Sequence, residues 1–88
     1  MPLDIRLTPN VVARIDTLGD RDLAVVSANV SSVARDPQRA GRPSFHSRAK
    51  EGAWQHVCPY SFMVLYRWGA DQSHPPNAVT IEDIIDRL

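Results

Sequence analysis

The stretch that decides the fold is GAWQHVCPYSFMVLYRW, residues 52–68, which is followed after a Gly/Asp/Pro-rich break by VTIEDIIDRL, residues 79–88. Two apolar runs are joined by the short turn Pro59-Tyr60-Ser61, and a third run follows the break. This pattern is typical of a three-strand meander. We therefore predict strands near Ala53–Cys58, Phe62–Trp68 and Val79–Ile85.

Amphipathic segments precede the meander. Leu3, Ile5 and Leu7 alternate with polar residues, which predicts a strand. Thr8-Pro9 suits a helix start, with the threonine side chain as the cap. Apolar residues at helical spacing predict helices over Pro9–Leu18 and Asp20–Arg35. The order strand, helix, helix, strand, strand, strand predicts an α+β fold, in which a helical hairpin packs on a small, mostly antiparallel four-stranded sheet.

The length of 88 residues suits one domain, residues 1–88. No apolar run approaches the ~20 residues that span a bilayer, and the amino terminus carries Asp4 and Arg6 instead of an apolar secretory segment. We therefore expect a cytoplasmic protein without membrane contact. The lone Cys58 cannot form an internal disulfide and lacks His or Cys partners at zinc spacing. We expect no metal site and no cofactor.

Alternation divides the side chains of the meander between two faces. Phe62, Val64, Tyr66 and Trp68 form the bulkier set, which we place against the helices. His56 falls on the buried face of its strand, where a hydrogen-bonded structural imidazole is commoner than a catalyst. The opposite face receives Gln55, Val57, Met63, Leu65 and Arg67.

Charge is balanced overall, with ten basic and ten acidic residues. This argues against a protein whose whole surface is built for nucleic acid. The distribution is uneven, because residues 35–50 hold five basic side chains and one acid, whereas residues 82–86 hold three acids. A polyanion would meet the first group through Arg48 and Lys50, and a solvated loop is the plainer interpretation. His46 lies beside them and could shuttle protons near neutral pH.

The element order, the central strand YSFMVLYRW preceded by GAWQHV, and the closing Ile-x-Asp-Arg resemble the RelE/ParE superfamily of bacterial toxin–antitoxin toxins. The resemblance covers nearly the whole chain. It implies a small cytoplasmic toxin that is neutralised by a cognate antitoxin. Nuclease members of the superfamily cut ribosome-bound messenger RNA, whereas the ParE branch poisons DNA gyrase. The implied target is therefore the ribosome with its mRNA, or gyrase.

Carried over position by position, the sequence departs from the nuclease pattern. Gln55 and Val57 stand where the second strand of the superfamily's nucleases usually offers basic residues. Met63 stands where their third strand usually offers Arg. Only Arg87 matches cleanly. Asp86 precedes it in place of a His or Lys, and no aromatic acid-base residue follows. Each lost catalytic group typically removes ~10²- to 10⁴-fold in rate.

We therefore favour a toxin that inhibits translation or DNA gyrase through binding. The alternatives are a ribosome-dependent mRNA endonuclease with a rearranged site and a non-catalytic protein-interaction module. For Arg67, pairing with Glu82, Asp83 or Asp86 is the plainer interpretation. The candidate catalytic residues are Arg87, Arg67 and His46, and the candidate substrate-binding residues are Arg48, Lys50, Gln55 and Trp68.

Met63, Leu65 and Val57 share a face whose equivalents in the superfamily are largely polar or basic. An apolar patch of this kind seldom stays bare on a soluble monomer. We therefore expect a partner to cover these three side chains. The occupant would be an antitoxin segment or a second copy of this chain, which would make a homodimer.

Overall fold

The computed structural model describes residues 3–58, 62–69 and 77–86. The strands form one sheet in the order β1-β5-β4-β3-β2, where β1 runs parallel to β5 and the other neighbours are antiparallel. None of the helices in the described part of the chain has the length and apolarity that crossing a membrane needs. In chain order the elements are β1 (Asp4–Leu7), α1 (Pro9–Ile15), α2 (Asp20–Arg35), α3 (Pro37–Ala40), β2 (Arg42–Pro43), β3 (Trp54–Val57), β4 (Phe62–Trp68) and β5 (Ala78–Asp86).

The α+β fold with a helical hairpin on a mostly antiparallel sheet is confirmed, but the sheet has five strands instead of four. The additional strand, β2, lies within residues 35–50, for which a solvated loop was the plainer interpretation. It contains only two residues and pairs with Trp54 and Gln55 of β3. A strand of two residues is too short to show alternation in the sequence, and its pairing is decided by the neighbouring strand.

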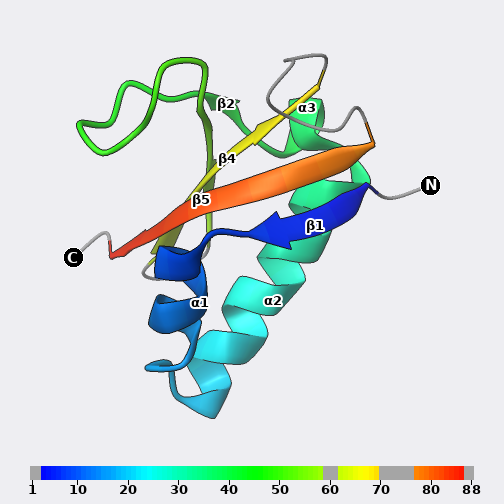
Figure 1. Ribbon diagram of the computed structural model, residues 1–88. Helices are drawn as coiled ribbons and strands as arrows, with labels where there is room; N and C mark the ends of the chain where they lie inside the picture. Colours follow the sequence, from blue (N-terminus) through cyan, green and yellow to red (C-terminus); the bar gives the residue numbers. More distant parts are fainter. Residues whose placement is uncertain (1–2, 59–61, 70–76, 87–88) are drawn as a thin grey trace.

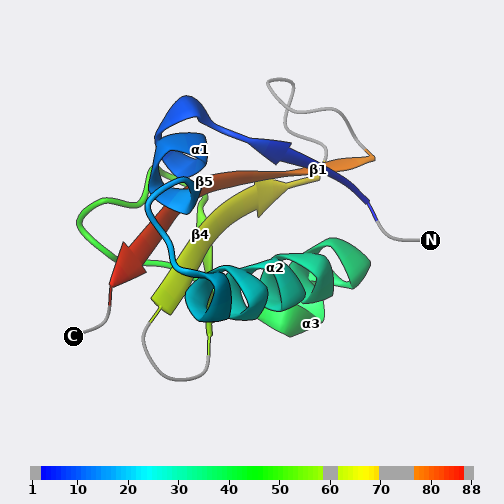
Figure 2. The same cartoon turned by 90° about the horizontal axis from the view of Figure 1, so that it is seen from below.

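Helices α1 and α2 cover one face of the sheet, and the segment between β2 and β3 lies on the other side (Figures 1 and 2). Val26, Val30 and Val33 recur at steps of four and three, so they share the side of α2 that packs on the sheet. Val11 of α1 joins the same core cluster. We call the side under these helices the helix-covered face and the other side the open face.

Helix α1 is shorter than predicted and begins differently. It ends at Ile15, and the chain continues to Leu18 through a tighter turn in which the Leu18 N–H donates to the Ile15 carbonyl at 3.0 Å. The prediction of a threonine side-chain cap is wrong, because Thr8 makes no capping bond to the helix. Its Oγ1 instead donates to Asn10 Oδ1 at 2.5 Å and lies 3.2 Å from the Glu82 carbonyl oxygen. The hydroxyl is thus used to join the start of α1 to β5.

The strand alternation of β4 is confirmed on the helix-covered face, where Phe62, Val64 and Tyr66 are buried in the core. The Tyr66 hydroxyl donates to the Pro37 carbonyl oxygen at 2.6 Å and so ties α3 to the sheet. Burial, followed by the negative charge of Asp36, raises the pKa of Tyr66 to about 12. Its neutral form is therefore the one that the fold favours.

Candidate functional site on the open face of the sheet

A β-bulge in β5 shapes the open face. Leu65 of β4 pairs with Asp83, whereas Tyr66 pairs with Ile81, so Glu82 is the extra residue. A bulge interrupts the alternation of a strand and re-aims the side chains beside it. Ile81 and Ile84 accordingly both lie in the core under the helices. Glu82 and Asp83, although adjacent in sequence, both make ion pairs with residues of the open face.

Three cations meet these two acids. Arg67 Nε of β4 forms an ion pair with Glu82 Oε1, and Lys50 Nζ lies 3.6 Å from Glu82 Oε2. Arg48 Nη2 lies 2.8 Å from Asp83 Oδ2. The two carboxylate side chains are mostly buried, at 9% and 13% exposure, while Arg48 and Lys50 remain exposed. We call these five residues the ion-pair cluster, and its formal charge is three positive against two negative.

The cluster fastens the segment 44–53 over the open face. The Ser44 N–H donates to the Ala53 carbonyl at 2.9 Å, which closes the segment into a loop. Gly52 has φ of +82°, in the left-handed region that glycine adopts without steric cost. Beneath this loop Leu65 is 1% exposed. The prediction that Leu65 belongs to a partner-binding surface is therefore wrong, because its own chain covers it.

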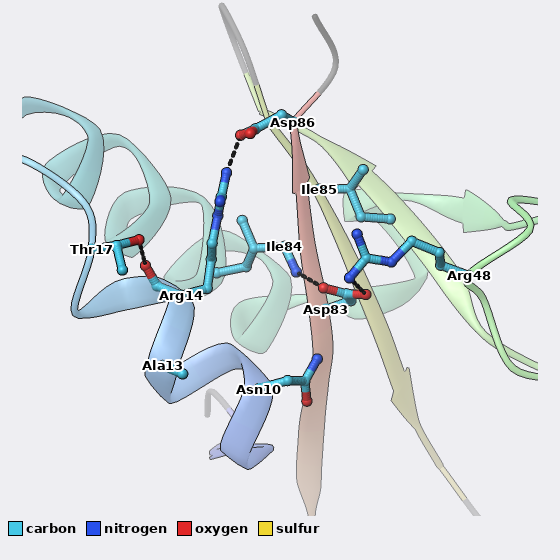
Figure 3. A pocket seen from close by; sticks show the side chains of 9 residues that line it. All are labelled: Asn10, Ala13, Arg14, Thr17, Arg48, Asp83, Ile84, Ile85 and Asp86. Carbon is cyan, nitrogen blue, oxygen red and sulfur yellow. Dashed lines mark hydrogen bonds and ion pairs between the residues drawn. The ribbon is translucent and has the colours of Figure 1, made fainter.

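A cleft of about 430 Å³ adjoins the cluster, between α1 and the end of β5. Figure 3 shows Arg14 paired with Asp86 on one wall and Arg48 paired with Asp83 on the other. Two guanidinium groups and two carboxylates therefore balance one another. Charge alone gives this cleft no preference for an anion, in contrast to the ion-pair cluster beside it.

One predicted binding residue, Gln55, and one predicted catalytic residue, His46, make hydrogen bonds that hold the loop. The side chain of Gln55 accepts a hydrogen bond from Ser44 Oγ at 3.0 Å. His46 bonds within the loop, where its Nδ1 accepts from the Arg48 N–H at 3.1 Å and its own N–H donates to Ser44 Oγ at 3.2 Å. The pairing of Arg67 with Glu82 confirms the plainer interpretation of that arginine. Arg87, the residue that matched the superfamily, lies outside the described residues.

Trp68 and His56 lie toward the helix-covered side of the sheet, away from the ion-pair cluster. Trp68 packs edge-to-face on Trp54, with ring centroids 4.7 Å apart, and both pack against the helix-covered core. The prediction that Trp68 binds substrate together with Arg48 and Lys50 is therefore not supported, because alternation places it on the opposite face of the sheet. His56 is a structural residue as expected, with Nδ1 2.5 Å from the Ala40 carbonyl oxygen and Nε2 2.6 Å from Asn29 Oδ1.

An apolar strip remains beside the cluster. Val57 pairs across the strands with Met63, which in turn pairs with Ile85. Val57 is 43% exposed and Met63 is half-buried, whereas Ile85 is 8% exposed. Two of the three residues predicted to meet a partner therefore keep accessible apolar surface. Within the described residues, no group of three or more His, Cys, Asp or Glu side chains is placed to hold a metal ion.

Glu82 and Asp83 were predicted only as partners of Arg67 and not as members of a functional site. The available signal was the spacing of Ile81 and Ile84, since core residues three apart in a strand require a bulge between them. The ion pairs themselves join residues far apart in sequence. Local patterns therefore gave no indication that Arg48 and Lys50 would meet these acids.

The arrangement has a counterpart among solved structures. A chain of the crystal structure of the toxin-antitoxin complex RelBE2 from Mycobacterium tuberculosis matches with a TM-score of 0.76 and 26% sequence identity, and the match covers 99% of this chain and 100% of that chain. The fold is that of a RelE/ParE-type toxin. No protein-family model and no curated protein matches the sequence. The RelE/ParE likeness therefore rests on the three-dimensional arrangement, and the ion-pair cluster lies on the open face of that fold.

Proposed function

We propose that this protein is the toxin component of a type II toxin–antitoxin system, neutralised by a cognate antitoxin and acting on translation or on DNA gyrase. The observation that carries the proposal is the match to a chain of a toxin–antitoxin complex over essentially the full length of both chains. A match of this extent includes the helices, the sheet and their connections. It is therefore more specific than a shared strand motif.

The ion-pair cluster supports a binding mode of action. Arg48 and Lys50 are exposed, and the cluster has one more cation than acid. A phosphate group of the target would replace Glu82 and Asp83 as the partner of these cations. Such an exchange gains less than binding to unpaired cations, because the existing ion pairs must be broken first. The target's affinity should accordingly fall with added salt.

A ribosome-dependent mRNA endonuclease with a rearranged site is the second candidate. The observation that favours it is that the Glu82 carboxylate forms ion pairs with both Arg67 and Lys50. In such a site the Glu82 carboxylate would take the proton of the ribose 2′-hydroxyl, whose oxygen attacks the adjacent phosphorus. The two cations would stabilise the charge that builds on the phosphorane oxygens. This chemistry needs a further group to protonate the departing 5′ oxygen.

Controlled expression in a bacterial host tests the main proposal. Growth, amino-acid incorporation and plasmid supercoiling are followed after induction, with and without co-expression of any small open reading frame that lies next to the gene. We expect growth arrest that the neighbouring gene product relieves, with either incorporation or supercoiling failing first. Normal growth and normal values of both readouts at a confirmed level of folded protein would overturn the toxin proposal.

A pair of substitutions separates binding from catalysis. Glu82→Gln removes the candidate base while keeping the side-chain shape, and Asp86→Asn is the matched control on the same strand, because Asp86 pairs with Arg14 outside the cluster. If the protein is an endonuclease, Glu82→Gln should abolish mRNA cleavage while Asp86→Asn leaves it intact. Growth arrest that survives Glu82→Gln without cleavage would favour the binding mode.

A further inference from the structure

Strand β1 forms one edge of the sheet. It is the terminal strand of the order β1-β5-β4-β3-β2, and all four of its residues are exposed. In the described part of the chain no other strand pairs with its outer side, and just before the strand the Leu3 N–H donates to the Ala34 carbonyl of α2 at 2.8 Å. An open edge of this kind is a template for pairing with another strand.

The backbone of β1 presents unused hydrogen-bonding groups along this edge. The Asp4 N–H donates to the Asn77 carbonyl at 2.9 Å, and the Thr8 N–H donates to the Ile81 carbonyl at 3.2 Å. In a parallel pair, alternate residues bond to the same neighbour. Asp4, Arg6 and Thr8 therefore face β5. The N–H and C=O groups of Ile5 and Leu7 point away from the sheet.

The side chains of β1 are patterned as well. Ile5 and Leu7 are 42% and 41% exposed, so the open edge carries two large apolar side chains that water reaches. They are in register with the core residues Val79 and Ile81 and so lie toward the helix-covered face. Asp4 and Arg6 lie on the other face and carry opposite charges.

The geometry points to a second copy of this chain as the occupant of the edge, paired antiparallel with β1 about a two-fold axis at Ile5. In this register Ile5 of each copy exchanges both backbone hydrogen bonds with Ile5 of the other. Asp4 of one copy then stands opposite Arg6 of the second copy, and the reverse pair forms on the other side of the axis. The charge pattern of the strand is thus complementary to itself, and the two sheets become continuous.

The alternative register, with the axis at Arg6, is disfavoured by the charges that it brings together. An axis at Arg6 would let the outward groups of Ile5 and Leu7 bond across the interface. It would also place Arg6 directly opposite Arg6 of the second copy, in the closer non-hydrogen-bonded type of pair. Like charges in that position are destabilising, whereas opposite charges are favourable. The Ile5 register is therefore preferred, although Leu7 then stands opposite Leu3, whose N–H is already bonded to the Ala34 carbonyl.

The interface is small, because each copy contributes a strand of four residues. Its area lies below that of a standard stable interface, so we expect a dimer that forms only at high protein concentration. This contact uses the opposite edge of the sheet from β2. It is independent of the apolar strip and of the proposed toxin activity, and its test does not involve toxicity.

Sedimentation equilibrium and amide hydrogen exchange on the full chain, from micromolar to millimolar concentration, test the inference. We expect reversible dimerisation and exchange of the Ile5 amide that slows as concentration rises. Arg6→Asp should weaken dimerisation about tenfold, since two opposite-charge pairs become two like-charge pairs. The swap Asp4→Arg with Arg6→Asp should restore it.

A second variant removes one outward donor without changing charge. Proline is tolerated on an edge strand where its N–H would face solvent, so Ile5→Pro should keep the fold and abolish dimerisation. Thermal melting at low concentration checks folding, and the charge-swap pair carries the test if this variant does not fold. A chain that stays monomeric, or a dimer that Arg6→Asp leaves unchanged, overturns the inference. Loss of antitoxin binding in Ile5→Pro with no self-association would assign the edge to the antitoxin instead.

Discussion

The two faces of the same sheet are stabilised by different means. On the helix-covered face, Val64 and Tyr66 are fully buried under valines of α1 and α2. On the open face, Leu65 is equally buried, but beneath a loop that ion pairs hold in place. A buried aliphatic side chain contributes about 1.5–3 kcal/mol, whereas an ion pair whose cation stays in water, as those of Arg48 and Lys50 do, contributes about 0–1 kcal/mol. Stability therefore comes mainly from one face, and the other can be rearranged at lower cost.

The largest effect should come from placing a charge in the helix-covered core. Val64→Asp buries a carboxylate without a partner, which costs several kcal/mol against a total stability of about 5–15 kcal/mol. We expect no cooperative unfolding transition by circular dichroism. Val57→Asp, on the neighbouring strand but 43% exposed, is the control and should melt close to the wild type. A folded Val64→Asp variant would contradict the assignment of the two faces.

Truncation of Leu65 measures how much the packing of the loop on the sheet contributes to stability. Leu65→Ala should lower the free energy of unfolding by about 2–5 kcal/mol, because the deleted methyl groups leave a cavity under the loop. The adjacent half-buried residue gives the comparison, and Met63→Lys should cost less than about 1 kcal/mol. Urea melts measure both. Equal losses for the two variants would mean that the loop does not exclude water from Leu65.

A raised pKa makes the helix-covered face sensitive to alkali. An unfolded tyrosine has its pKa near 10.0, whereas that of folded Tyr66 is about 12, so the unfolded state loses its proton first as pH rises. The stabilisation is complete below pH 10 and is lost through pH 12, with a total of about 2–3 kcal/mol. Urea melts from pH 8 to 12 should show this decline, and Tyr66→Phe should remove it. An identical decline in Tyr66→Phe would assign it to other groups.

The ion-pair cluster should affect binding more than stability. Arg48→Ala combined with Lys50→Ala removes the two exposed cations of the cluster. It should change the free energy of unfolding by less than about 2 kcal/mol, because Glu82 keeps Arg67 and Asp83 keeps the Ile84 N–H as partners. It should weaken binding to single-stranded RNA and flatten the dependence of that binding on salt, because fewer counterions are released. Asp83→Asn should act in the opposite direction by freeing Arg48. An unchanged salt slope would leave these cations without a role in binding.

Alternation and helical spacing predicted the helix-covered face because both are local. The positions of Phe62, Val64 and Tyr66 followed from a period of two, and those of Val26 and Val30 from helical turns. The open face depends on two features that local periods do not contain. One is the bulge at Glu82, which turns two consecutive acids toward the same side. The other is the pairing of Arg48 with Asp83, which is decided by the course of the loop.

The edge-to-face contact of Trp54 and Trp68 gives the protein an optical signal of its own. These are the two tryptophans of the chain, and they lie on the neighbouring strands β3 and β4. Fluorescence and the coupled indole bands in circular dichroism therefore report separation of these strands. The loop 44–53 contains no tryptophan. A loop that opens while the strands stay paired would leave the emission almost unchanged, so its motion has to be followed with a label placed at an exposed position such as Ser47.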